Sequence, residues 1–449
     1  MPVKWIYAFL LCLACVGAYG PGRMENSSGD TISTRYWPVA ILEHHTLKLN
    51  PLKEKLGGIA YAAINMGDDL LPRNGWGTAV FSVPFYAMAD LLDLGGSDWM
   101  PDRINRVSRW NAILIATASV IALFFLLVRI VSPEIAMLSS AVFAFGTWNW
   151  SLAPQGLHSQ TCAVLAHILS LHLLLSICSA PKGESPRLKA FFLGLIQALI
   201  WSLRPQDVLL IAPCALTLHR RRVLLPYAVA VLALILPLLA TYKSMYGYYL
   251  GAYGVIDAMA GVATWQPNFL RGFFGMLFSP NRGAIVFFPL LLWVPYLWKK
   301  LIPSSKIPKS FSDSIAMGSM LYFGVLCFLV YWHSTWSYGP RYLYDLLPYI
   351  WIPLTLMFKD ALEWASARKP RLPAPVIILC LICALEGVIV HGLGNYNYDL
   401  YVWNHRMSPV GDEAAWDFRN WMMLDVWKAD SEISTRYPKG LERLKQYGF

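Results

Sequence analysis

Residues 110–130 read WNAILIATASVIALFFLLVRI, a run with one charged side chain, Arg129, next to its end. A helix that crosses a bilayer needs roughly 20 predominantly apolar residues, so this run is long enough to span. Similar runs predict further spans near 5–20, 76–93, 134–150, 160–180, 190–218, 223–242, 284–298, 313–331, 342–358 and 373–391. The run at 190–218 is long enough for one broken helix or for two. The sequence therefore predicts an all-α polytopic membrane protein with about 11 or 12 transmembrane helices.

The composition excludes an ordinary soluble protein. Of 449 residues, 56% are hydrophobic and only 14% are charged, against about a quarter in soluble domains. The eight cysteines all lie in apolar runs, and the adjacent histidines after Glu43 lack a third ligand at helical spacing, so no metal site is predicted.

The net charge of +10 is best explained by topology. The first loop, 20–75, holds six basic and six acidic residues, and the tail, 392–449, holds seven basic and eight acidic ones. Five short links hold 17 basic residues against five acidic ones, and they lie at 94–109, 181–189, 219–222, 299–312 and 359–372. By the positive-inside rule these links are cytoplasmic and the two long segments are extracytoplasmic, so no nucleic-acid partner is implied.

This assignment divides the chain into a transmembrane domain, 1–391, and an extracytoplasmic tail, 392–449. The domain includes the large first loop, 20–75, with interfacial helices. One inconsistency remains, because strict alternation cannot place both 94–109 and 181–189 inside. Either a segment between them is re-entrant or 190–218 is one broken helix, and the side of 148–160 stays open.

Ionisable groups at membrane depth are costly and usually functional or paired. Asp30 lies about ten residues beyond the first span, in the polar run NSSGDTISTRYWP at 26–38. It is a candidate site residue, although Asp30 or Ser33 could also simply cap a short interfacial helix over 34–45.

Two arginines stand at expected helix starts, Arg282 in FSPNRG at 278–283 and Arg341 in WSYGPRYLYD at 336–345. A cation in the first turn opposes the helix dipole, and a bound phosphate would remove the conflict. Asp345 follows Arg341 by four residues, the spacing of neighbours on one α-helical face, and it is either a structural partner or one that orients Arg341 for substrate.

Two further candidates interrupt apolar runs. Arg204 and Asp207 mark a helix break near the outer surface or a pair that neutralises itself between helices. His158 is either a phosphate ligand or a structural histidine.

Together these residues suit transfer from a phosphate-linked donor. Arginines would hold the phosphate, and a carboxylate would deprotonate the acceptor hydroxyl. Because a phosphate leaves without protonation, no second catalytic carboxylate is required, unlike in glycosidases. The P-loop, G-x-S-x-G and H-E-x-x-H motifs are all missing from the sequence.

At these residues the chain resembles the GT-C superfamily of integral-membrane glycosyltransferases, which includes the dolichyl-phosphate-mannose protein mannosyltransferases and the lipid A aminoarabinose transferase. A bacterial branch has D-T-x-x-x-R-Y-x-P after the first helix, L-F-S-P-x-R-G before a middle helix and W-S-Y-G-P-R before a late one. The corresponding runs here begin at Asp30, Leu277 and Trp336. They contain Arg35 and Tyr338, and their order covers essentially the whole chain.

The resemblance implies a polyprenyl-phosphate-sugar donor, inversion at the anomeric carbon and Asp30 as general base. It implies donor-phosphate binding for the arginines and polar residues of the motifs, so we expect substrate contacts at Arg35, Arg282, Tyr338, Arg341 and Asp345. His158 and Arg204 lie outside the three motifs, and we expect substrate contacts there from their positions in the sequence alone. The branch often has K-Y-P-P-G where this chain has Pro72 to Gly77, and Arg73 could supply the missing lysine charge.

The resemblance also implies the inner (plasma) membrane of a bacterium, with an active site on the extracytoplasmic side. The acceptor is a glycan, a lipid or a protein. No cofactor is implied, and dependence on a divalent cation is left open. The alternatives are a flippase or transporter of lipid-linked sugars, which would carry charges near the midplane of several helices, and a polysaccharide polymerase or ligase, whose large external loop usually comes late in the chain.

Overall fold

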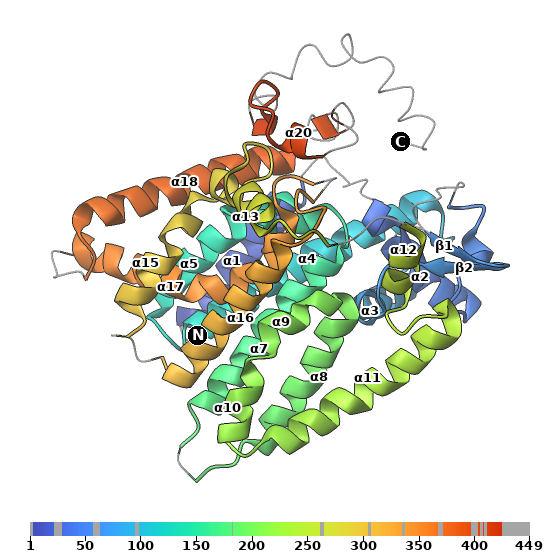
Figure 1. Ribbon diagram of the computed structural model, residues 1–449, viewed down its shortest axis with the longest axis horizontal. Coiled ribbons are helices and arrows are strands. Elements are labelled where there is room, and N and C mark those ends of the chain that lie inside the picture. Colours follow the sequence, from blue (N-terminus) through green and yellow to red (C-terminus); the bar gives the residue numbers. More distant parts are fainter. Residues whose placement is uncertain are drawn as a thin grey trace.

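The computed structural model describes residues 3–21, 29–56, 63–94, 98–181, 183–260, 265–303, 307–334, 337–366, 371–396, 403–404, 407 and 411–423. These residues form a helical bundle with one small hairpin (Figure 1). Among them, four helices are long and apolar enough to cross a membrane by length and composition. They are α4 (Pro101–Leu127), α7 (Ser159–Cys178), α11 (Leu224–Tyr246) and α18 (Ala374–Tyr396).

The remaining predicted spans are shorter or interrupted helices packed around these four. They correspond to α1 (Val3–Tyr19), α5 (Pro133–Phe145), α8 (Arg187–Leu203), α9 (Val208–Ile211) with α10 (Cys214–Arg220), α14 (Ala284–Phe287) with α15 (Val294–Leu301), α16 (Lys309–Leu326) and α17 (Leu347–Ala365). Prolines interrupt several of them, since proline cannot donate the helical hydrogen bond. Pro289, for example, starts a 3-10 turn, η4 (Pro289–Trp293), between α14 and α15. The chain is an all-α polytopic membrane protein, as predicted.

A cap of short elements covers one end of the bundle. It consists of α2 (Gly29–His44), η1 (Asn50–Leu52), β1 (Ala63–Met66), β2 (Asp69–Pro72) and α3 (Gly77–Leu91). The two strands pair antiparallel, with Ala63 opposite Pro72. Trp37, Leu49, Leu52 and Tyr86 form part of a buried apolar cluster within the cap. The cap elements α2, α3, β1 and β2 lie together at the right-hand side of Figure 1.

The prediction that residues 76–93 cross the membrane is wrong. The start of α3 rests on the end of α8, where a Cβ on Gly77 would lie 2.5 Å from Leu203. Beyond the other end of α3, Trp99 donates to Glu43 of α2, and its carbonyl accepts from Lys55, which follows η1. A 15-residue helix with both ends at the cap cannot cross a bilayer.

Moving α3 into the cap removes the inconsistency of the charge pattern. Residues 98–109 lie beside the cap, whereas the described residues next to the links at 181–189, 219–222 and 299–312 come together at the opposite end of the bundle. There Arg221 donates to the carbonyl of Ala180 (3.0 Å) and Thr217 bonds Ser314 (3.0 Å). The break at Arg204 turns the chain back, so 190–218 forms two passes, α8 and α9–α10. Without 94–109, the four remaining links hold 14 basic and three acidic residues.

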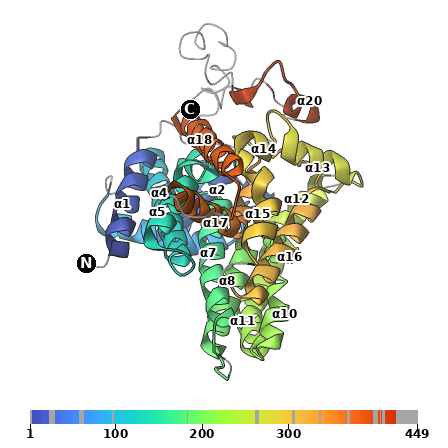
Figure 2. The same cartoon turned by 90° about the vertical axis from the view of Figure 1, so that its left-hand side faces the viewer.

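The described part of the tail packs onto the bundle beside α13 (Phe269–Phe278). Both views show α20 (Asp412–Ala415) next to α13 (Figures 1 and 2). Most of the predicted extracytoplasmic tail, including everything after residue 423, lies outside the described residues.

Candidate functional site

Asp30 lies in the first turn of α2, where its negative charge suits the helix dipole. The helix starts earlier than the predicted 34–45, so Asp30 is inside it, not its cap. Two hydrogen bonds hold this turn in place: Ser33 donates to Asn74 (2.6 Å), and Thr34 donates to the carbonyl of Leu157 (2.8 Å). The carboxylate is therefore fixed between the cap and the loop before α7.

Arg341 reaches Asp30 from the other half of the chain. Its Nη1 lies 2.5 Å from Oδ2 of Asp30, and the arginine side chain is 7% exposed while the carboxylate is 26% exposed. Arg341 starts the 3-10 helix η5 (Arg341–Leu346), which leads directly into α17. Two of the residues singled out by separate sequence motifs are thus in direct contact.

Positive charge dominates the surroundings of Asp30. Burial opposes ionisation of this carboxyl, but Arg341, His158 and Arg73 together lower its pKa to about 2. Asp30 is therefore ionised at neutral pH, and Arg73 contributes positive charge at the place where the family pattern has a lysine.

His158 lies in the loop that leads into α7, next to Leu157, whose carbonyl accepts from Thr34 of α2. It directly precedes α7 and is 1% exposed. Burial, together with the charge of Arg341, lowers the pKa of His158 to about 3, although Asp30 acts in the opposite sense. The ring is neutral at physiological pH and can serve as a hydrogen-bonding group, not as a cation.

Arg35 stands one turn after Asp30 on α2. Its guanidinium donates to Asn105 (3.1 Å) and to Thr31 (2.9 Å), and its side chain is buried. It thereby joins α2 to α4 and adds positive charge near His158.

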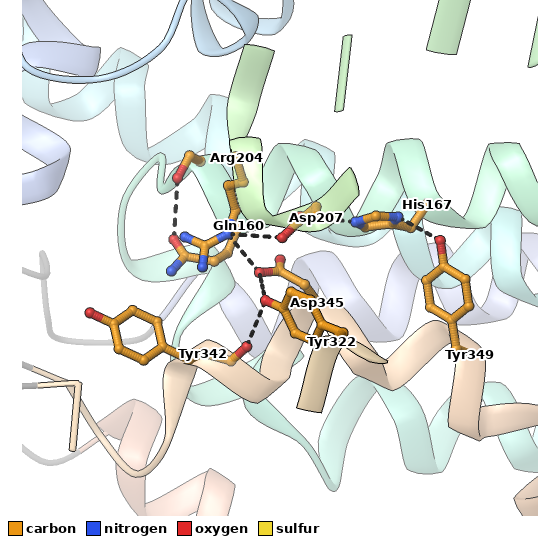
Figure 3. A network of polar contacts seen from close by, with 9 residues as sticks. Gln160, His167, Arg204, Asp207, Tyr322, Tyr342, Asp345 and Tyr349 are labelled. Atoms are coloured by element: carbon orange, nitrogen blue, oxygen red, sulfur yellow. Dashed lines mark hydrogen bonds and ion pairs between the residues drawn. The ribbon is translucent and has the colours of Figure 1, made fainter. Parts of the chain in front are cut away.

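Arg204 lies at the break after α8 and forms two ion pairs (Figure 3). Its Nε is 2.7 Å from Asp345 and 3.6 Å from Asp207, and both carboxylates are completely buried. Arg204 and Asp207 therefore lie at a helix break and also form an ion pair with each other.

Asp345 pairs with Arg204, not with Arg341 as the four-residue spacing predicted. The reason is the local geometry, because residues 341–346 form a 3-10 helix. With three residues per turn, positions four apart point in different directions. Arg341 faces Asp30, and Asp345 faces Arg204 and Tyr322, whose hydroxyl donates to it at 3.2 Å.

The ion cluster extends into α7 through a histidine that the sequence reasoning missed. His167 contacts Asp207 with Nε2 (3.0 Å) and Tyr349 with Nδ1 (2.8 Å), as Figure 3 shows. A histidine within an otherwise apolar span is itself a signal. His167 lies in the middle of α7, away from the outer ends of the spans where the other candidate residues stand.

Tyr253 on α12 (Ala252–Ala260) is a second residue that was missed. Burial raises the pKa of this phenol, while the charges of Arg204 and Asp30 act on it in opposite senses. The neighbours Ala252 and Val255 pack with Ile64 and Leu71 of the hairpin. No motif marked this position, because a single tyrosine has no distinctive spacing.

The side chains of Arg282 and Tyr338 form hydrogen bonds with segments other than α2. Arg282 is fully buried and donates to the carbonyl of Ser337 (2.8 Å) and the side chain of Asn404 (2.7 Å). Tyr338 donates to the carbonyl of Val390 on α18 (3.0 Å). Trp336, which belongs to the same motif, lies outside the described residues.

Within the described residues, no group of three or more His, Cys, Asp or Glu side chains is arranged to hold a metal ion. What the site offers instead is one ionised carboxylate, partly exposed, beside several cationic side chains. This arrangement can accept a proton and can bind an anion at adjacent positions.

Comparison with solved structures identifies the architecture. The chain aligns with the crystal structure of ArnT from Cupriavidus metallidurans bound to undecaprenyl phosphate, at a TM-score of 0.50 and 12% identity, over 94% of this chain and 75% of that one. The chain has the fold of ArnT. The apo form of the same protein aligns at a TM-score of 0.47 and 12% identity, over 92% of this chain and 77% of that one.

No family model and no curated protein sequence matches the chain. The ArnT fold confirms the architecture that the motif resemblance implied. At 12% identity this likeness concerns the fold alone, and the roles of the individual residues depend on their geometry.

Proposed function

We propose that the chain is a GT-C glycosyltransferase that transfers a sugar from a polyprenyl-phosphate donor to an extracytoplasmic glycan, lipid or protein. The observation that carries this proposal is the contact between Asp30 and Arg341. It joins a proton acceptor to an anion-binding group within a fold shared with ArnT, whose crystal structure contains undecaprenyl phosphate.

In the proposed reaction, the acceptor hydroxyl attacks the anomeric carbon and transfers its proton to Asp30. The bond between that carbon and the phosphate oxygen breaks, and polyprenyl phosphate leaves with one additional negative charge. Attack from the side opposite the leaving group inverts the configuration. Arg341, with the nearby charge of Arg73, stabilises the phosphate as its charge grows.

The ion pair has a mechanistic consequence. A carboxyl with a pKa of about 2 is a weak base, and general-base catalysis works best when the pKa lies near the working pH. When the donor phosphate binds Arg341, it competes with Asp30 for the guanidinium. The pKa of Asp30 then rises, so donor binding itself strengthens the base.

The same proposal sets the orientation. The four remaining links hold 14 basic and three acidic residues, described residues at three of them meet at one end of the bundle, and Asp30 lies in the cap at the other end. By the positive-inside rule this charge distribution supports an orientation in which the cap faces away from the cytoplasm, and we propose that in a bacterial cell the site lies on the extracytoplasmic side of the inner membrane.

Purified protein in liposomes with a radiolabelled polyprenyl-phosphate sugar tests the proposal. We expect release of polyprenyl phosphate and a new glycosidic bond. Arg341→Gln should lower this turnover at least tenfold, and the exposed Lys48→Gln should not change it. Movement of the lipid-linked sugar across the bilayer without a new bond would instead establish a flippase.

A further inference from the structure

Residues 280–282, just before α14, all contact the C-terminal tail. Asn281, which is fully buried, donates from Nδ2 to the carbonyls of Ala414 (2.8 Å) and Asp417 (3.0 Å), and its Oδ1 accepts from the backbone of Met422 (2.7 Å). Trp421 donates to the carbonyl of Pro280 (2.7 Å). These contacts attach the tail to Pro280 and Asn281 mainly through backbone groups.

Arg282 is at the centre of this attachment. Its Nη2 donates to Asn404 (2.7 Å), its Nη1 contacts the sulfur of Met422 (3.4 Å), and its guanidinium lies 5.2 Å from the ring centre of Trp403. The side chain exposes none of its surface. A buried guanidinium must be satisfied by hydrogen bonds, and here the tail supplies two of them, from Asn404 and Met422.

The same guanidinium also holds the turn that carries Arg341. Nη1 of Arg282 donates to the carbonyl of Ser337 (2.8 Å). The hydroxyl of Ser337 in turn donates to the carbonyl of Gly339 (2.9 Å), which also accepts from the backbone of Arg341 (3.1 Å). Gly339 has φ +69°, a conformation that favours glycine, so this turn is tightly defined between Arg282 and Arg341.

We propose that Arg282 anchors the tail and positions the 337–341 turn, and is not a ligand of the donor phosphate. A phosphate ligand must present donors to the substrate, whereas the Arg282 side chain is enclosed by the tail and the turn. The tail is then part of the site's framework. Both views place α20 beside α13, at the start of this attachment (Figures 1 and 2). There Asp412 pairs with Arg271 and accepts from Trp332 (3.0 Å).

That Arg282 does not bind the donor phosphate rests on the proposed function, but its anchoring of the tail can be measured without that function. Arg419 is exposed in the described tail and provides a cleavage site for trypsin. Cleavage of a folded segment requires local opening, so its rate reports release of the tail. We compare full-length wild type, Arg282→Gln, Asn404→Leu and the double variant in nanodiscs, with Lys48→Gln as a control in the cap.

We expect both single variants to accelerate cleavage at Arg419 about tenfold or more, and the double variant to add little, because the two residues act through one contact. Binding of undecaprenyl phosphate should weaken by a similar factor in both single variants. Wild-type cleavage in Asn404→Leu, or lost lipid binding in Arg282→Gln with the tail still protected, would overturn the proposal. If wild type binds no undecaprenyl phosphate, the proposed function fails, and the cleavage rates alone decide the anchoring.

Discussion

At the scale of single residues, the ion pair of Asp30 makes a prediction about pH. In the free enzyme its pKa is about 2, and activity falls only when pH drops through the pKa of the base. The kcat/KM profile, which reports the free enzyme, should therefore show no acid limb above pH 4 from Asp30 or from His158, whose pKa is about 3.

In the complex, the donor phosphate competes for Arg341 and the pKa of Asp30 moves up towards its ordinary value of about 3.9. The acid limb of kcat should therefore lie at higher pH than that of kcat/KM. Initial rates between pH 3 and 8 check this. An acid limb of kcat/KM at pH 6 to 7 would show that a different group is the base.

The ion cluster of Arg204 predicts a large effect on stability. Arg204→Met leaves the carboxylates of Asp207 and Asp345 buried without their cation, and breaking a buried pair typically costs about 3–5 kcal/mol. We expect a markedly lower thermal midpoint in detergent. Lys309→Met, which removes an exposed pair with Asp313, should stay close to wild type, and equal shifts in the two variants would refute the structural role.

At the scale of elements, α16 approaches the bundle through a glycine. A Cβ on Gly318 would lie 2.3 Å from the carbonyl oxygen of Leu210 on α9, whereas a Cβ on Gly324 of the same helix would meet nothing within 4 Å. Small residues allow close helix packing in membranes. Gly318→Ala should therefore lower the thermal midpoint and Gly324→Ala should not. A similar midpoint for both variants would show that α16 can shift away from α9.

The elements also show what could be predicted from the sequence. The apolar runs predict most helices, because length and hydropathy directly reflect a bilayer. They misassign α3, since a 15-residue apolar helix can equally form part of a cap, and only the contacts of Trp99 and Gly77 show where its ends lie.

Part of the candidate site could also be predicted from the sequence, because some of its residues belong to motifs. Motif residues identified Asp30 and Arg341, and the structure places them in contact. The partner of Asp345 was not predictable, because it depends on the 3-10 geometry of residues 341–346. The enclosure of Arg282 depends on contacts between segments far apart in sequence, and these leave no local pattern.

At the scale of the whole molecule, the fold predicts which loops share a side of the membrane. Single cysteines at Asp98, beside the cap, and at Arg222, at the opposite end, can be labelled with an impermeant thiol reagent. The position at 98 should react in intact cells, and the position at 222 only after permeabilisation. Labelling of both positions from the same side would contradict the arrangement in which α3 lies within the cap.

The central claim is that Asp30 accepts the proton of the acceptor. The most direct measurement is the rate of sugar transfer by Asp30→Asn in single turnover, together with its affinity for undecaprenyl phosphate, and with the exposed Asp69→Asn as control. We predict that transfer by Asp30→Asn falls by at least about 10²-fold, while lipid binding is kept or strengthened because Arg341 no longer has a competing carboxylate. Transfer at the wild-type rate would contradict the account.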